Sequence, residues 1–419
     1  MISINKKMVV ISTLIAIVYI VSCTQTKKED TTSDTTKSTS INKYSSDAIN
    51  NPDKFAWDVF IEISKPADPQ KPDGEIVWQK EWVNAEDVFN DPMNKPDWGK
   101  IVGLPLLRDK TKGVPLQQEL FNEMLFKMNL SKAQIKSLHS ITTCKDKMPA
   151  DSLIRNETKM NKATFDFIVS NNMYYAEGVE DFYNKKVKID APIEAREIKA
   201  IWKPIKEADK PKYHFVEKGE EIYGLVSLHI ITKDLPNWTW ATFEHIDNEC
   251  LADAENNPKL KSIDRYGRNS DGTISKELKG DFIKNGMPDK WLNYRLRGTQ
   301  TDFTSPTGEK IILANTYTES GFELTSSCIT CHSKATVGPK LTQEQLPPGL
   351  RKDRIPDYFN HLDIFETREP APIGNLGSPD PTWFYNYLPS NQKEVKYIQT
   401  DFMWSIPFRV KRQVKYQVK

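Results

Sequence analysis

The sequence has no excess of charge of one sign, because 58 Lys and Arg residues balance 57 Asp and Glu residues for a net charge of +1. A chain so balanced has no broad electrostatic field to attract nucleic acid, so we expect no nucleic-acid partner. It also lacks an internal repeat, which excludes repeat architectures. With 38% hydrophobic residues over 419 positions, the chain can still bury a substantial core in one large domain or a few smaller ones.

Long apolar runs are almost absent. Residues 8–21 form the one long run, and its 14 residues are too few for the roughly 20 of a spanning helix, which excludes a polytopic transporter. Two lysines precede the run, and an apolar pair, a serine and Cys23 close it, which resembles the lipobox of bacterial lipoproteins. We therefore predict a lipoprotein signal peptide over residues 1–22 and lipidation of Cys23. An ordinary signal peptide with an incidental Cys23 is the alternative.

The segment after this cysteine is poor in apolar residues. Residues 24–50 consist largely of Thr, Ser, Lys and Asp, a composition that cannot bury enough surface to order itself. We predict a flexible tether over residues 23–50 and a folded domain over residues 51–419. The lipid would hold the protein to a membrane of the bacterial cell envelope, on the periplasmic side or in the outer membrane, with soluble partners in reach.

The folded part shows both helical and strand patterns. Helices are expected at residues 116–125 and after Asn161, where apolar residues recur every three or four positions. Short β-branched and aromatic stretches predict strands at residues 198–202, 222–231 and 310–316. The expected class is α+β, as one large domain with a β-rich centre and peripheral helices.

Residues 328–332 carry the most specific signal, because Cys328, Cys331 and His332 form C-x-x-C-H, the attachment signature of c-type haem. Two cysteines three positions apart lie on adjacent sides of a helical turn, so both sulfurs can form thioethers to one porphyrin. We predict one covalent haem c, attached at both cysteines, with His332 as the proximal iron ligand. A zinc site or a redox disulfide is the alternative, and zinc would need further ligands, for which His361 is the downstream candidate.

Cysteine is otherwise scarce, with five residues in the chain. Cys144 and Cys250 remain after Cys23 and the motif pair are assigned. Exported proteins often pair such residues, but the sequence does not place them within bonding distance. A disulfide and two separate core cysteines therefore both stay open.

The sixth iron ligand is not specified by a motif. Met403 lies 71 residues after His332, a separation compatible with the methionine ligand of small cytochromes c. A methionine between aromatic residues is, however, commonly core filling. His245 is a further candidate, and an iron without a sixth protein ligand also stays open.

His229 is the other leading candidate for the distal ligand. It lies in the strand expected at residues 222–231. Strand alternation predicts that its side chain shares a face with Leu225, Ser227 and Ile231.

Prolines crowd the C-terminal part, where ten follow His332. A small all-helical cytochrome c module needs uninterrupted helices, and prolines at this density remove backbone donors too often. We expect the haem to be bound near the C-terminal part of the large domain, against its β-rich centre, and not in an appended helical module.

These features together resemble a family of large, single-haem bacterial proteins called cytochrome c family proteins. The resemblance covers about residues 55 to 404 and rests on residues 55–58, 228–230, 240–248, 294–300, 313–316 with Glu319, 327–332 and 401–402. It implies haem c and export, and no particular reaction. The family pattern near the end is Asp-Phe-Ser-Phe, so the position of Met403 need not supply a ligand, which favours His229 or an open site.

The sequence therefore predicts a lipid-anchored, single-haem electron carrier that works with redox protein partners. The alternative is a haem enzyme of peroxidase or oxygenase type with an open distal site, in which His229 or His245 would act as acid and base. A gas or redox sensor, or a subunit of a larger complex, is a third candidate. The reduction potential, the donor and acceptor and the oligomeric state do not follow from the sequence.

Overall fold

The computed structural model describes residues 44–104, 154–320, 323–339, 376–390 and 392–413, which belong to one compact unit, Lys43–Lys419. The signal peptide, Cys23 and the helix expected at residues 116–125 lie outside these ranges. Helices and strands both build the unit, which confirms a mixed helix-and-sheet class. Among the described residues, no helix combines the length and the apolar character that crossing a membrane requires.

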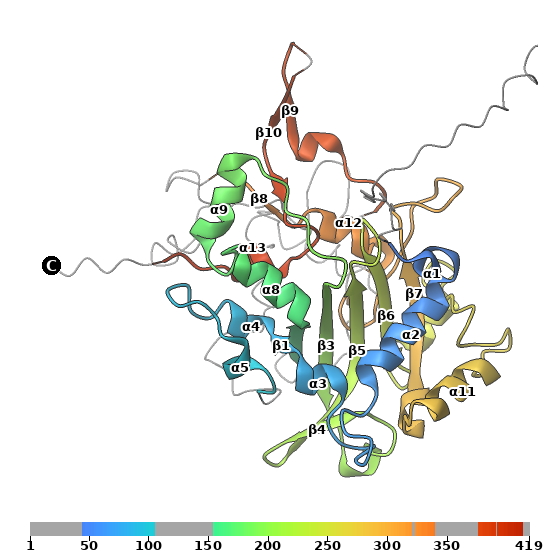
Figure 1. The fold of residues 1–419 in the computed structure, drawn as a ribbon. Coiled ribbons are helices and arrows are strands. Elements are labelled where there is room, and N and C mark those ends of the chain that lie inside the picture. Colours follow the sequence, from blue (N-terminus) through green and yellow to red (C-terminus); the bar gives the residue numbers. More distant parts are fainter. Residues whose placement is uncertain (1–43, 105–153, 321–322, 340–375, 391, 414–419) are drawn as a thin grey trace, which may run out of the picture. The chain divides into compact units, whose positions relative to one another are not determined.

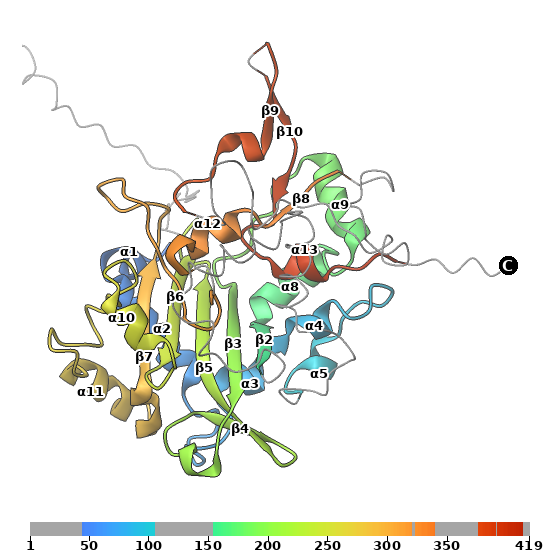
Figure 2. The ribbon, with the colours of Figure 1, turned by 180° about the vertical axis from the view of Figure 1, so that it is seen from behind.

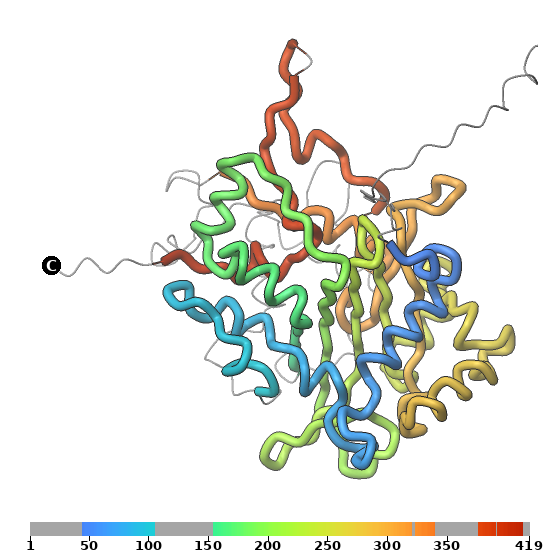
Figure 3. The backbone as a smooth tube through the Cα atoms, viewed as in Figure 1, coloured from blue at the N-terminus to red at the C-terminus, as the bar shows by residue number. Residues whose placement is uncertain are grey.

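An antiparallel sheet lies at the centre of the unit (Figure 1). Its strand order is β1-β2-β3-β5-β6-β7, and β4 pairs with β5 outside this path. Its strands are β1 (Val83–Asn84), β2 (Arg155–Met160), β3 (Arg196–Pro204), β4 (Phe215–Lys218), β5 (Glu221–Thr232), β6 (Thr239–His245) and β7 (Tyr294–Gln300). Two small ribbons pair β8 (Thr336–Val337) with β11 (Ile398–Gln399), and β9 (Tyr385–Tyr387) with β10 (Lys393–Val395). The second ribbon extends away from the sheet (Figure 3).

Short helices surround this sheet. The α-helices are α1 (Ser46–Asn50), α2 (Pro52–Ser64), α3 (Val77–Glu81), α4 (Ala85–Val88), α5 (Trp98–Ile101), α8 (Lys162–Ser170), α9 (Ala176–Lys185), α10 (Leu251–Asn256), α11 (Lys276–Lys284), α12 (Cys328–Ser333) and α13 (Ser405–Arg409). The 3-10 helices are η3 (Glu207–Asp209), η4 (Asp289–Asn293), η5 (Glu323–Thr325) and η8 (Pro381–Trp383).

Helix α8 begins where its sequence pattern predicts. The side chain of Asn161 accepts a hydrogen bond from the backbone N–H of Thr164, 3.1 Å away, and so caps the first turn. Phe165, Ile168 and Val169 form its buried face. The predicted helix is confirmed because its cap and its apolar period are both local features.

The strands expected at residues 198–202 and 222–231 are confirmed as parts of β3 and β5, but residues 310–316 do not form a strand. The backbone N–H of Leu313 donates to Ser326, and the N–H of Asn315 donates to the carboxylate of Glu319. The N–H of Thr316 donates to the carboxylate of Glu244. Because side chains and a loop take these donors, the segment satisfies its backbone without a strand partner.

Helix α1 lies within the last residues of the segment that we predict as a tether. Residues 46–50 form this helix, the hydroxyl of Ser45 accepts from the N–H of Ala48, and Ala48 is fully buried. The folded part therefore begins a few residues before position 51. Residues 23–43 lie outside the described part of the chain.

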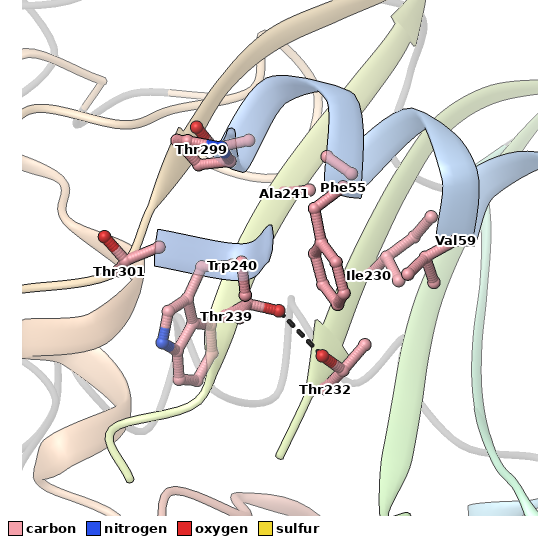
Figure 4. A pocket seen from close by; sticks show the side chains of 12 residues that line it. Phe55, Val59, Ile230, Thr232, Thr239, Trp240, Ala241, Thr299 and Thr301 are labelled. Atoms are coloured by element: carbon pink, nitrogen blue, oxygen red, sulfur yellow. Dashed lines mark hydrogen bonds between the residues drawn. The ribbon is translucent and has the colours of Figure 1, made fainter. Parts of the chain in front are cut away.

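One face of the sheet packs beneath α2, which crosses it in Figure 1. We call this the apolar face; its strand residues are Ile198, Ala200, Trp202, Leu228, Ile230, Ala241, Phe243 and Leu296. Phe60 of α2 lies at its centre, with ring centroids 4.5 Å from Phe243 and 5.5 Å from Trp291. A small pocket opens at its edge, where Phe55 and Val59 lie over Ile230 (Figure 4).

The alternate side chains of the same strands form the opposite face. We call this the polar face; its residues are Glu197, Lys199, Ser227, His229, Thr242 and Glu244. Ser227 and Glu244 are fully buried, and His229 keeps only 12% of its side chain exposed. Figure 2, viewed from behind, shows α12 beside one end of β5 and β6. The sheet therefore presents a buried polar surface in the neighbourhood of the C-x-x-C-H motif.

Candidate haem-attachment site

The two motif cysteines lie on one short helix, α12, and both are free thiols. Gln300 of β7 ties this helix to the sheet, because its amide donates to the hydroxyl of Ser327 over 2.7 Å and accepts from the N–H of Ile329. Burial raises the pKa of Cys331 to about 11 and that of Cys328 well above its ordinary value. Both sulfurs are therefore protonated at neutral pH, unlike the low-pKa thiolate of a redox-active C-x-x-C pair.

His332 presents the geometry of a metal ligand. Its Nδ1 donates a hydrogen bond to the backbone carbonyl of Phe402, 2.8 Å away, which leaves Nε2 as the nitrogen with a free lone pair. Burial lowers the pKa of His332 to about 4, so the imidazole is neutral, as a ligand must be. The indole of Trp240 packs against it with ring centroids 4.5 Å apart.

Three titratable side chains gather on the polar face near this histidine. Lys199 of β3 and His229 of β5 are directly paired across the strands. Glu319 belongs to the loop that follows β7. The Nε2 atom of His229 lies 3.5 Å from the Oε2 atom of Glu319 without hydrogen-bond geometry. Asn315 fixes this loop, since its side-chain amide donates to the hydroxyl of Thr242 over 3.2 Å.

The electrostatics of these groups favour neutral forms. Burial, followed by the charges of Lys199 and His332, lowers the pKa of His229 to about 3. Burial raises the pKa of Glu319 to about 8, although the N–H of Asn315 and Lys199 oppose that shift. Burial also lowers the pKa of Lys199, against the attraction of Glu319. A neutral imidazole beside a carboxyl group that titrates near neutral pH can bind a metal or exchange a proton.

Met403 is adjacent in the chain to the residue whose carbonyl binds the motif histidine. It is fully buried in the same hydrophobic cluster as Cys328 and Ile329. Its N–H donates to the carbonyl of Thr400, and it directly follows Phe402, whose carbonyl binds Nδ1 of His332. The structure therefore places its backbone on the Nδ1 side of that ring.

His245 does not join the site. Its Nε2 lies 3.0 Å from the carbonyl of Lys212, and its Nδ1 accepts from the N–H of Asp247. Its ring stacks on that of Tyr213 with centroids 3.7 Å apart. Both nitrogens are occupied, so this histidine supports the local fold. His361 lies outside the described residues.

The expected surroundings of His229 need one correction. Ser227 shares its face as predicted, but Leu225 points into the apolar core with Leu228. The register between β3 and β5 shifts at Ile201, where Ser227 and Leu225 oppose successive residues of β3. A bulge adds one residue and reverses the alternation beyond it, which strict period-two reasoning cannot foresee.

Sequence reasoning missed two parts of this region. Lys199 carries a signal that could have been found, since it is a lysine at an alternating position inside a strongly apolar strand. The ion pair between Lys233 and Asp401, with 2.6 Å between Nζ and Oδ1, joins residues far apart in the chain and has no local signal. Cys250 is disulfide-bonded, and Cys144 lies outside the described residues.

The side chains present fit a covalently attached haem. Two free thiols share a helical turn, the adjacent histidine is oriented through Nδ1, and a second neutral histidine lies nearby. Among the described residues, no three His, Cys, Asp or Glu side chains are arranged to hold a metal ion, so a zinc site would need ligands from elsewhere in the chain. No protein-family model, curated protein or solved structure matches this chain.

Proposed function

We propose that this protein is a lipid-anchored c-type cytochrome of the bacterial cell envelope that carries one covalent haem and transfers electrons to redox protein partners. The observation that carries the proposal is the hydrogen bond from Nδ1 of His332 to the carbonyl of Phe402, directly after two free thiols on one helical turn. Metal-ligating histidines typically donate their second ring nitrogen in this way, which fixes the tautomer and ring orientation. The family resemblance that we draw from the sequence motifs leads to the same proposal.

Each residue of the motif has a distinct role in this proposal. Cys328 and Cys331 form the thioether bonds, which keep the group attached after export. His332 offers Nε2 to the iron, while Phe402 holds the opposite edge of its ring. When bound, the haem supplies an iron that alternates between the ferric and ferrous states. Lipidation of Cys23 holds this centre to the membrane, and the tether gives it access to partners.

His229 is the better candidate for the sixth ligand than Met403. The backbone of Met403 directly follows the carbonyl that binds Nδ1 of His332, and its side chain is buried in the hydrophobic cluster, whereas a second ligand would have to reach the group that Nε2 would bind. His229 is neutral, keeps only 12% of its side chain exposed on the polar face, and lies close enough to His332 for a charge on one ring to affect the other. Two histidine ligands would favour electron transfer, because a six-coordinate iron changes little between its oxidation states.

A haem enzyme with an open distal site remains the second candidate function. The specific observation in its favour is that Nε2 of His229 has no hydrogen-bond partner among the described residues and lies 3.5 Å from Glu319. These two groups could accept and return a proton at a reacting oxygen without binding the iron. Lys199, paired with His229 across the strands, could donate a hydrogen bond to that oxygen.

The first experiment is an absorption spectrum of the exported, full-length protein, in the ferric and ferrous states, with and without carbon monoxide. We expect c-type bands that are lost in Cys328→Ala and Cys331→Ala. Ser333→Ala is the matched control on the same helix, since its hydroxyl donates to the carbonyl of Thr330. Absence of c-type bands from the unmodified protein would overturn the proposed function.

The second experiment separates the carrier from the enzyme. For the carrier we expect a low-spin spectrum indifferent to carbon monoxide, which becomes high-spin and carbon-monoxide-binding in His229→Gln. Met403→Leu and His245→Gln should leave the spectrum unchanged. A high-spin protein that binds carbon monoxide before any substitution would instead favour the enzyme, and peroxide turnover by His229→Gln and Glu319→Gln would then be measured.

A third experiment addresses the anchor. Cys23→Ser should move the haem protein from the membrane fraction to the soluble periplasmic fraction, because a single acylation site carries the attachment. Retention of the variant in the membrane, with the signal peptide removed, would contradict the lipoprotein prediction.

A further inference from the structure

The carbonyl that binds His332 belongs to a tight turn with unusual backbone geometry. The N–H of Met403 donates to the carbonyl of Thr400, which closes a β-turn over Asp401 and Phe402. Both central residues have positive φ, 50° at Asp401 and 66° at Phe402. Turns with two positive φ values usually take Asn-Gly, and a bulky phenylalanine is disfavoured there. The surroundings must therefore hold this turn in place.

A buried ion pair between Lys233 and Asp401 stabilises the turn. Asp401 accepts from the N–H of Ala191 through Oδ2, at 2.7 Å, and from Nζ of Lys233 through Oδ1, at 2.6 Å. Only 2% of the Lys233 side chain and 4% of the Asp401 side chain are exposed. Lys233 is itself fixed, because Nζ also donates to the carbonyl of Pro236 and lies 3.3 Å from a carboxylate oxygen of Asp190. Three parts of the chain thus meet at the carboxylate of Asp401.

We infer that Lys233 and Asp401 are positioning residues that aim the carbonyl of Phe402 at Nδ1 of His332 and so set the basicity of the proposed iron ligand. This inference rests on the proposed function. A well-aimed carbonyl draws the Nδ1 proton, which makes Nε2 a stronger donor to the iron and stabilises the ferric state. A relaxed turn would weaken that hydrogen bond and raise the reduction potential.

The test is the reduction potential of the haem-loaded protein with substitutions in the pair. Asp401→Asn should raise the equilibrium constant for reduction of the iron about tenfold. This corresponds to a reduction potential that is higher by about 59 mV for one electron. Lys233→Met is the decisive variant, because losing a positive charge near the iron would by itself lower the potential, whereas relaxing the turn raises it. We expect a rise in both variants and no shift in Lys233→Arg, which keeps the ion pair.

Lys203→Met is the matched control, since it breaks another ion pair of 2.6 Å, with Glu249, away from the turn. It should lower thermal stability without moving the potential. A fall or no change in the potential of Lys233→Met, or an equal rise in Lys203→Met, would overturn the inference. A wild-type protein without haem would instead refute the proposed function, so the two failures are distinct.

Discussion

The two faces of the central sheet are buried to a similar extent but with opposite chemistry. Beneath α2, Phe60 and Phe243 make ring contacts that need no particular partner. On the opposite face, Glu244 is fully buried and forms an ion pair of 2.9 Å with Arg297. The comparison teaches that the apolar face stabilises the fold by removing surface from water, whereas the polar face is stable only while each group keeps its partner.

The polar face is also the face that serves the proposed site. Lys199 and His229 lie on it, within electrostatic range of His332. A sheet with two apolar faces would be simpler to stabilise, because buried charges cost free energy unless they are well paired. The four predictions below test the contrast between the faces, from the largest expected effect to the smallest.

Phe60→Ala should have the largest effect, because it removes a ring from the centre of the apolar face. We expect the free energy of unfolding to fall by about 3–5 kcal/mol, measured by urea denaturation. Phe60→Leu keeps most of the volume and should cost less than about 1.5 kcal/mol. Ile49→Ala, at a side chain that is 62% exposed, is the control. Equal costs for all three variants would contradict the packing that we describe.

Arg297→Met, on the polar face, should lower the free energy of unfolding by about 3 kcal/mol, because it leaves the carboxylate of Glu244 buried without its cation. Adding Glu244→Gln should restore much of that loss, since the amide carries no charge to compensate. A double-mutant cycle measures this coupling. Additive costs in the cycle would show that the two residues act independently, and the contrast with the apolar face would then fail.

Glu197→Gln should change how stability depends on pH. Burial raises the pKa of Glu197 to about 7, although the hydroxyl of Ser405, 2.7 Å away, opposes that shift. A raised carboxyl pKa means that the folded state holds the proton more tightly, so this stability is complete below pH 4.5 and is lost as the pH rises through about 7. The wild type should lose up to roughly 3 kcal/mol from this group between those conditions.

The measurement is the difference in unfolding free energy between Glu197→Gln and the wild type across that pH range. The difference should shift in favour of the variant as the pH rises, because glutamine does not titrate. Glu220→Gln, at an exposed position, is the control. Parallel stability curves for the wild type and Glu197→Gln would show that this carboxyl group titrates normally in the folded state.

Thr232→Val should have the smallest effect. Its hydroxyl shares a hydrogen bond of 2.7 Å with that of Thr239 at the edge of the apolar face (Figure 4). The single substitution leaves one buried hydroxyl unpaired and should lower the free energy of unfolding by about 1 kcal/mol. Replacing both threonines by valine should leave the free energy of unfolding nearly unchanged. A double variant that is less stable than the single one would mean that this face, too, depends on specific polar partners.

The parts of the fold that the sequence predicted correctly have local causes. Asn161 and the apolar period behind it define α8, and β-branched residues define β3 and β5. The segment 310–316 has the same composition as a strand, but its donors bind Glu319 and Glu244. Composition alone could not reveal that acceptors from distant segments would replace a neighbouring strand.

The candidate site, too, has features that short sequence patterns predict and features that depend on contacts between distant segments. The motif at residues 328–332 and the candidate His229 are readable in the sequence, since each rests on a short pattern. The pairing of His229 with Lys199 depends on the register of β3 against β5, and the exclusion of Leu225 from that face depends on a bulge. Neither follows from residue types alone.

The sequence by itself determined that two thiols and an imidazole share one helical turn, because covalent spacing within five residues leaves little freedom. It also determined the mixed class of the fold, through periods of three to four and of two. The tertiary structure alone decided that Phe402 faces His332 and that Lys233 holds Asp401, because these contacts join segments 70 and 168 residues apart. Contacts over such separations form only when the whole core packs, so no local pattern encodes them.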